Sequence, residues 1–329
     1  MNDLALSTLS QFRPPCKRLR TNVCLRGEDI EARRRFLLEL DVCLQEVLHF
    51  GVISMVWVAK HRLVNATIAI KVSNKANGAA FFSTRDSNQR VTDEFSLLRQ
   101  LDHRNILSCS STYESSSHVY SALAYMENGD LVADVQRVGS YSNLSAQRLA
   151  RQILAGVTYL HQLSILHRDI KPDNIFLTSA ERSLAIAKIS DFGYARRCQS
   201  PCQCYSFLGT ITYMAPEVLR NSIVGCRESR LAYGFPVDTW SCGLTFYAAL
   251  TGMCPYDVDF DIDAQGTDLR SQVLAGKVYY DPVDWQGKHL AMSFVQALAH
   301  YLPEKRLSLE KAMEHPWWFF STIISSTQV

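Results

Sequence analysis

Long hydrophobic runs are missing from this chain of 329 residues, and so is a large excess of either charge. No stretch approaches the roughly 20 apolar residues that a membrane-spanning helix needs, and polar residues at Ser7 and Gln11 interrupt the N-terminus where a secretory signal would be apolar. The formal net charge of +2 gives no long-range field suited to nucleic acid. We therefore expect an intracellular protein, in the nucleus, the cytoplasm or both, that binds neither a membrane nor nucleic acid directly.

Regular cysteine spacing is absent as well. The ten cysteines are scattered along the chain, which indicates a reducing compartment rather than a disulfide framework. The exception is a group of three, Cys198, Cys202 and Cys204. Three thiols could bind zinc or sense oxidants, but a structural zinc site takes four ligands and no further pair is evident. The favoured interpretation is a set of ordinary thiols in a loop.

The length of the chain exceeds the usual size of a single hydrophobic core, so we expect two lobes. Residues 1–43 show no strong hydrophobic period and are expected to form a flexible extension, with a short charged helix at 28–40. A basic cluster follows a proline pair at 14–20 and is either a nuclear localisation signal or a solvated part of the extension. We expect no second folded domain after the short Ser/Thr-rich tail at 319–329.

Three kinds of functional side chain lie within the run HRDIKPDN at 167–174. Asp169 supplies a carboxylate, Lys171 an ammonium group and Asn174 an amide. A short loop can hold the carboxylate at a substrate hydroxyl while the amide reaches a magnesium ion on nucleotide phosphates. The pattern therefore predicts a loop for phosphoryl transfer.

Further motifs appear in a fixed order along the chain. The apolar run at 184–189 predicts a strand, and Asp191 follows it in an Asp-Phe-Gly triplet. The run GTITYMAPE occupies 209–217. Upstream, Lys71 lies in the strand pattern IAIKV, and Glu94 opens an amphipathic helical pattern. The last two signals are weak alone, but the order and spacing of the whole set are specific.

Together these motifs resemble the eukaryotic protein kinase family over residues 44–318. The resemblance implies an α+β fold with a small β-rich N-lobe at 44–124, a larger α-helical C-lobe at 127–318, and ATP and Mg²⁺ as cofactors. It implies that Asp169 is the catalytic base, that Lys171 stabilises charge on the transferring group, that Asn174 and Asp191 bind Mg²⁺, and that Glu94 holds Lys71 at the α- and β-phosphates.

The same resemblance indicates the serine/threonine branch of the family. Lys171 stands two residues after Asp169, and Gly209 and Thr210 precede the run ITYMAPE. Thr210 is expected to hydrogen-bond both Asp169 and Lys171. The partners implied are protein substrates with Ser or Thr acceptors, and the sequence does not indicate an oligomeric state.

Adenine recognition is expected at the connection between the lobes. By resemblance, Leu123 guards the inner pocket, while the backbone C=O of Ala124 and N–H of Met126 pair with adenine. Asp130 would meet the ribose hydroxyls or a basic substrate residue. The ring would lie between the side chains of Val56, Ala69 and Phe176.

The glycine-rich loop that covers the phosphates departs from the family pattern. Family members carry three glycines there, because glycine lets backbone N–H groups approach the phosphates. Here His49 and Ser54 replace the outer two, only Gly51 remains, and the β-branched Ile53 stiffens the tip. We expect weaker but retained ATP binding.

The alternative is a pseudokinase that uses the fold as an interaction platform. Against it stands the presence of all four residues whose loss usually marks that state, which are Lys71, Asp169, Asn174 and Asp191.

Supporting residues also match the family. Asp238 resembles the buried helix aspartate that holds the catalytic loop, and Arg306 resembles the partner of Glu217. The runs around these motifs resemble the calcium/calmodulin-dependent group and DNA-damage checkpoint kinases, which implies a preference for basic residues before the acceptor, read by acids such as Asp130 and Asp173.

Regulation by phosphorylation is open. In the family, the activation segment runs from the Asp-Phe-Gly triplet to the Ala-Pro-Glu that ends at Glu217. Arg168 is a residue of the type that pairs with a phosphate on this segment, and the candidate acceptors are Ser200, Tyr205 and Ser206. Such hydroxyls in a polar loop are more often simply solvated.

Overall fold

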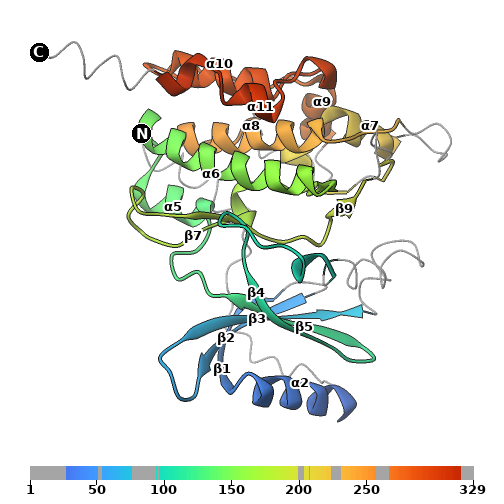
Figure 1. Ribbon diagram of the computed structural model, residues 1–329. Coiled ribbons are helices and arrows are strands. Elements are labelled where there is room, and N and C mark those ends of the chain that lie inside the picture. Colours follow the sequence, from blue (N-terminus) through green and yellow to red (C-terminus); the bar gives the residue numbers. More distant parts are fainter. Residues whose placement is uncertain are drawn as a thin grey trace, which may run out of the picture. The chain divides into compact units, whose positions relative to one another are not determined.

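The computed structural model describes residues 27–50, 54–75, 94, 96–198, 204–206, 208–223, 231–256 and 267–319. The chain divides into two compact units, and it passes from the smaller to the larger between Glu127 and Asn128. Most of the elements of the two units are labelled in Figure 1. None of the helices in the described ranges is long and apolar enough to cross a membrane.

The smaller unit is an antiparallel sheet with one helix before it. Its five strands are ordered β1-β2-β3-β5-β4. Alternating apolar residues, as in TIAIKVSN of β3, suit a sheet whose two faces meet different surroundings. The elements are α2 (Gly27–Glu39), β1 (Val42–Phe50), β2 (Ser54–His61), β3 (Thr67–Asn74), β4 (Cys109–Glu114) and β5 (His118–Ala124).

Helix α2 packs on one face of this sheet. Phe36 is fully buried and lies with its ring centroid 5.8 Å from that of Tyr120 and 6.2 Å from that of Tyr113. Ile70 and Ala122 belong to the same apolar cluster. The helix expected at 28–40 is therefore present, and its apolar side forms part of the core of the smaller unit.

The larger unit is mainly helical. Two short ribbons accompany the helices: β6 (Ile165–Leu166) pairs with β9 (Arg196–Arg197), and β7 (Ile175–Leu177) pairs with β8 (Ala187–Ile189). The helices are α5 (Leu131–Val138), α6 (Asn143–Gln162), α7 (Pro216–Ile223), α8 (Pro236–Thr251), α9 (Thr267–Ala275), α10 (His289–Leu298) and α11 (Leu309–Ala312).

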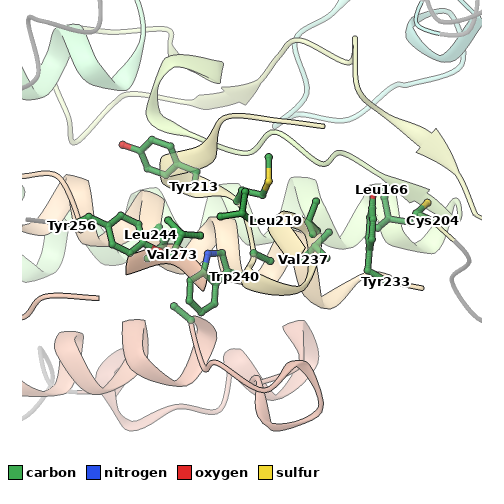
Figure 2. Packing of buried hydrophobic residues seen from close by; sticks show 14 of the residues in the cluster. Leu166, Cys204, Tyr213, Leu219, Tyr233, Val237, Trp240, Leu244, Tyr256 and Val273 are labelled. Atoms are coloured by element: carbon green, nitrogen blue, oxygen red, sulfur yellow. The ribbon is translucent and has the colours of Figure 1, made fainter. Parts of the chain in front are cut away.

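Helix α8 is the central helix of this unit. Almost all of its side chains are buried, as expected for a helix that is apolar on every side. Pro236 lies in its first turn, and Gly252 closes it with a left-handed φ of 76° and an N–H bonded to Ala248 O at 2.8 Å. Figure 2 shows Val237, Trp240 and Leu244 of α8 within the apolar cluster.

The predicted α+β class is confirmed, whereas the strand expected at 184–189 is shorter than predicted. Only Ala187–Ile189 forms β8. The N–H groups of Leu184 and Ala185 bond to Glu181 O at 3.0 and 2.9 Å, and these bonds close a turn. The Leu184 side chain is exposed, so its apolar character marks no buried strand.

Candidate active site

The loop after β6 is held by a carboxylate from α8. Asp238 is fully buried, and its Oδ2 and Oδ1 accept the backbone N–H groups of His167 at 2.9 Å and Arg168 at 2.8 Å. Arg168 has a positive φ of 69°, so this carboxylate satisfies two N–H groups at a strained bend. The predicted contact between Asp238 and the loop backbone is confirmed.

The Asp238 carboxylate also meets His161 Nε2 at 2.9 Å. Burial alone would raise the pKa of Asp238, but the hydrogen bond and charge of His161, together with His167, lower that pKa below its usual value. The loop is therefore anchored to an ionised group.

Both carboxylate oxygens of Asp169 are engaged by fixed donors. Oδ1 accepts the Thr210 backbone N–H at 2.9 Å and the Thr210 hydroxyl at 3.0 Å. Oδ2 lies 3.0 Å from Lys171 Nζ and accepts Asn174 Nδ2 at 3.0 Å. Asp169 is 4% exposed, so its orientation is set by these donors rather than by water.

Lys171 completes the contact with Thr210. Its Nζ donates to Thr210 Oγ1 at 2.6 Å, which confirms that Thr210 bridges Asp169 and Lys171. Burial alone would lower the pKa of Lys171, but the charge and hydrogen bond of Asp169 outweigh it and raise that pKa. The lysine therefore stays cationic beside the carboxylate at neutral pH.

Gly209 allows the segment with Thr210 to approach Asp169. Its φ is +115°, and a Cβ there would lie 2.7 Å from the backbone oxygen of Arg168. Because a backbone atom cannot move aside cheaply, only glycine fits.

Asn174 and Asp191 are the residues predicted to bind Mg²⁺. Asn174 Nδ2 donates to Asp169 O at 2.8 Å and to Asp169 Oδ2, which leaves the amide oxygen as the atom able to ligate a cation. Asp191 is exposed and has a left-handed φ of 59°, while Phe192 beside it is buried with its ring centroid 5.0 Å from that of His167. One carboxylate and one amide oxygen suit Mg²⁺, which takes its other ligands from phosphate and water.

The described residues contain no cluster of three or more His, Cys, Asp or Glu side chains that could hold a metal alone.

The smaller unit contains the predicted pair of Lys71 and Glu94. Lys71 Nζ lies 2.6 Å from Glu94 Oε1, with 15% and 10% of the two side chains exposed. Lys71 comes from β3, and Glu94 has helical backbone, followed by buried Leu97 and Leu98. The predicted contact is confirmed.

The strand register places the predicted nucleotide contacts of this unit on one face of the sheet. Directly paired residues share a face, and Val56 pairs with Lys71, while Ala69 pairs with Leu123. Ser54 pairs with Ser73, two residues after Lys71, and so lies on that face too. The face is opposite the one that carries Ile70 and the cluster with α2.

The side chain of Ala124 lies on the other face of the sheet, which is compatible with the predicted contact of its backbone with adenine. Ala124 pairs with Ile68, on the other face, and its N–H donates to Ser108 O at 3.1 Å. Its side chain is therefore not directed at the face of Lys71. Met126 lies two residues beyond it and is half-buried.

The remaining residues predicted to contact the nucleotide are Gly51, Phe176 and Asp130. Gly51 lies outside the described residues. Phe176 belongs to the larger unit, where it forms an isolated bridge with Asp130. Asp130 Oδ1 accepts the Ala133 N–H at 2.9 Å, so this carboxylate caps α5 and is only 6% exposed. Its predicted contact with ribose or a basic residue stays a prediction.

Tyr233 is a contact residue that the motifs did not indicate. Arg168 Nε donates to Tyr194 O at 2.6 Å, and its Nη1 lies 2.9 Å from Ser206 Oγ and 3.4 Å from Tyr233 Oη. The Tyr233 hydroxyl donates to Ser206 O at 2.7 Å. Of the candidate phosphate acceptors, Ser206 thus lies at Arg168, and Ser200 is outside the described residues.

A buried ion pair fixes the end of the segment that carries Thr210. Arg306 Nη1 and Nη2 donate to Glu217 Oε1 at 2.6 Å and Oε2 at 2.7 Å. Arg306 also donates to His300 O and Pro236 O at 2.8 and 2.9 Å. The predicted pairing of Glu217 with Arg306 is confirmed as a two-bond contact.

Comparison with known families agrees with this geometry. The family described as "Protein kinase domain" matches residues 44–318. The chain belongs to the protein kinase family. Within this kinase the matched residues include the Lys71–Glu94 pair and the whole Asp169 constellation.

Curated relatives of this kinase are similar over most of the chain. The serine/threonine-protein kinase RAD53 of Saccharomyces cerevisiae is 30% identical over 279 residues, which are 83% of this chain and 32% of the yeast protein. The calcium/calmodulin-dependent protein kinase type 1B of Rattus norvegicus is 30% identical over 275 residues, 83% of this chain and 74% of the rat protein. A probable serine/threonine-protein kinase of Dictyostelium discoideum, fhkE, is 31% identical over 83% of this chain and 37% of its own length.

The kinase therefore spans about a third of the yeast and Dictyostelium relatives and about three quarters of the rat one. Two of the three are named serine/threonine kinases, and the chain is a member of that branch.

Proposed function

We propose that this protein kinase transfers the γ-phosphoryl group of ATP to serine or threonine hydroxyls of protein substrates. The observation that carries the proposal is the constellation around Asp169. Its two oxygens are oriented by Thr210, Lys171 and Asn174 at 2.9 to 3.0 Å. Such fixed orientation matters because phosphoryl transfer depends on positioning and electrostatics more than on covalent chemistry.

In this mechanism Asp169 orients the acceptor hydroxyl and takes its proton as the new bond to phosphorus forms. Lys171 remains protonated beside it and stabilises negative charge on the transferring group. The Thr210 hydroxyl is hydrogen-bonded to both Asp169 and Lys171 and holds the two side chains in place. The short segment from Gly209 to Thr210 thereby links the conformation of the activation segment to the base.

The smaller unit would supply the nucleotide contacts. Lys71, held by Glu94, would bind the α- and β-phosphates, and the backbone of Ala124 and Met126 would pair with adenine. Val56, Ala69 and Leu123 would line the face of the sheet toward adenine. Asn174 and Asp191 would hold Mg²⁺, which neutralises charge on the β- and γ-phosphates when bound.

The competing function is a platform for protein interactions with little or no catalysis, favoured by the loss of glycine at His49 and Ser54. A radiolabelled-phosphate assay on generic protein substrates separates the two. We expect the unaltered protein to label serine and threonine, and Asp169→Ala and Asp191→Ala to reduce labelling to background. Equal labelling by all three proteins would reject the enzyme and support the platform.

We further propose a place beside the calcium/calmodulin-dependent and checkpoint kinases, with a preference for basic residues before the acceptor. The similarity to the type 1B kinase supports this placement. Asp173 is the better candidate acid, because Asp130 is engaged as a helix cap. Phosphorylation of a peptide library should show the basic preference, and Asp173→Ala should weaken it. An acidic or proline-directed preference would contradict the placement.

A further inference from the structure

Two of the clustered cysteines lie in direct contact in the activation segment. Cys198 Sγ is 3.5 Å from Cys204 Sγ, and both residues are buried, at 6% and 0% exposure. Both belong to the apolar cluster around α8, and Figure 2 shows Cys204 beside Leu166 and Tyr233. The third cysteine of the group, Cys202, lies outside the described residues.

Each thiol is carried by backbone that is held by a different partner. The Cys198 N–H donates to Ser164 O at 2.7 Å, just before β6. Cys204 exchanges two backbone hydrogen bonds with Tyr233, at 3.3 and 3.0 Å. The sulfur contact therefore lies between two stretches of backbone that are each hydrogen-bonded to another part of the chain.

We propose that Cys198 and Cys204 are a modification site, which small peroxides convert to a reversible intramolecular disulfide. The sulfur of Cys198, the less buried of the two residues, would attack a peroxide oxygen, giving a sulfenic acid and releasing water when the peroxide is hydrogen peroxide. The Cys204 sulfur then attacks the sulfenic sulfur, the S–S bond forms and a second water leaves. Together the two thiols lose two protons and two electrons, and one hydrogen peroxide is reduced to two waters.

The geometry permits this bond with a small movement. The sulfurs must approach from 3.5 Å to the S–S bond length of about 2.05 Å, so a shift of about 1.5 Å suffices. Burial raises the pKa of Cys204 to about 11, although the positive charge of Arg168 opposes this. The attack of Cys204 on the sulfenic sulfur should therefore be slow, because the thiolate is the reactive form. The burial of both residues limits the first step to small oxidants.

The bond would act on the activation segment. Ser206 is two residues after Cys204, its hydroxyl lies 2.9 Å from Arg168 Nη1, and its carbonyl accepts the Tyr233 hydroxyl. Drawing Cys204 toward Cys198 moves the stretch that leads to Ser206, so the contacts of Arg168 beside Asp169 become dependent on the thiol state. Disulfide formation itself does not rest on the proposed kinase activity, whereas this consequence does.

The test uses the full chain carrying Cys202→Ser. Trypsin releases residues 198–220 as one peptide, because no Lys or Arg lies between Arg197 and Arg220, and that peptide then contains only the two proposed thiols. The protein is treated with millimolar hydrogen peroxide, and its free thiols are blocked under denaturing conditions. After digestion, the mass of the peptide is measured by mass spectrometry with and without dithiothreitol.

We expect most of the peptide to lose the mass of two hydrogens and to regain it on reduction. Unmodified thiols, or sulfinic and sulfonic acids without a cross-link, would overturn the proposal. In the protein that retains all three thiols, a cross-link that includes Cys202 in place of either partner would overturn it as well.

Activity is then measured on the same samples, with Cys198→Ala/Cys202→Ser as the matched control that cannot form the bond. We expect phosphorylation to change at least twofold on oxidation, to return with dithiothreitol, and to stay constant in the control. A cross-linked protein with unchanged activity would overturn the link to the activation segment. A protein that cross-links but never phosphorylates would instead reject the proposed function and leave the disulfide site in place.

Discussion

Asp238 accepts the backbone N–H of Arg168 through Oδ1 at 2.8 Å, and this bond connects the central helix α8 to the residue before the proposed base. Its Oδ2 binds the N–H of His167 in the same way. Asp238→Asn places an NH₂ group against one of these donors. We expect a loss of about 2–3 kcal/mol in the free energy of unfolding, the upper range for a buried donor left unsatisfied, measured by urea denaturation. An unfolding free energy within experimental error of the unaltered protein would contradict this role.

The same carboxylate predicts a pH dependence of stability. Its pKa in the folded protein lies below its usual value of about 3.9. A lowered folded pKa adds stability that is fully present above the unfolded pKa and is lost as the pH falls through the folded pKa. The unaltered protein should therefore lose more unfolding free energy than Asp238→Asn between about pH 6 and pH 3. Parallel curves for the two proteins would show that Asp238 is not the group responsible.

The ion pair of Glu217 and Arg306 is expected to be costly to break from either side. Both groups are buried and joined by two hydrogen bonds, so a single substitution leaves the other charge without its partner. Glu217→Gln should lower the unfolding free energy by about 3–5 kcal/mol, while the exposed Glu304→Gln serves as the control and should change it little. Adding Arg306→Met to Glu217→Gln should restore part of the loss. Equal effects of Glu217→Gln and Glu304→Gln would contradict a buried pair.

The contacts that the sequence predicted are those between motif residues whose chemistry is complementary. The pairing of Lys71 with Glu94 and of Thr210 with Asp169 was predicted through the family that these motifs resemble. They formed as predicted because each pair satisfies groups that would otherwise be buried without partners. The fold class followed from the same motifs through the family they resemble.

Other contacts depend on tertiary packing that no local pattern encodes. The run at 184–189 is apolar, yet its first half closes a turn and exposes Leu184, since burial is decided by what packs against a segment and not by its composition. The hydrogen bond from Tyr233 to Ser206 joins residues that are 27 positions apart, and no motif indicates it. The sequence does group Cys198 with Cys204, but it does not predict that their sulfurs are in contact. The role of Asp130 as a helix cap could have been predicted from the sequence, because an aspartate before the helical run LVADVQRV is a typical N-cap.

Thr210 offers a test of positioning that leaves the base itself intact. Thr210→Val keeps the shape of the side chain but removes the hydroxyl that bridges Lys171 and Asp169. We expect kcat to fall about tenfold to a hundredfold, because small misplacements of catalytic groups have effects of this size, with little change in the KM for ATP. Thr210→Ser restores the hydroxyl and should recover most of the rate. A uniform rise in KM with unchanged kcat would assign Thr210 to binding.

His49 sits where the phosphate-covering loop begins, and its register indicates a direct effect on nucleotide affinity. It pairs with Val56, which pairs in turn with Lys71, so the imidazole shares the face of the sheet that carries the proposed phosphate contact. A bulky exposed side chain at a position where the family has glycine should keep backbone and phosphate apart. His49→Gly should therefore tighten ATP binding several-fold.

Thermal unfolding with and without millimolar Mg-ATP measures this effect, because a ligand that binds only the folded state stabilises it in proportion to RT ln(1 + [L]/Kd). We expect the unaltered protein to gain a small rise in unfolding temperature, His49→Gly a larger one and Lys71→Met none, since the last variant keeps the strand but loses the cation paired with Glu94. No rise for either the unaltered protein or His49→Gly would mean that the site does not bind nucleotide. An equal rise in the two proteins would show that His49 does not weaken ATP binding. Ser54 would then be the replacement of glycine to test next.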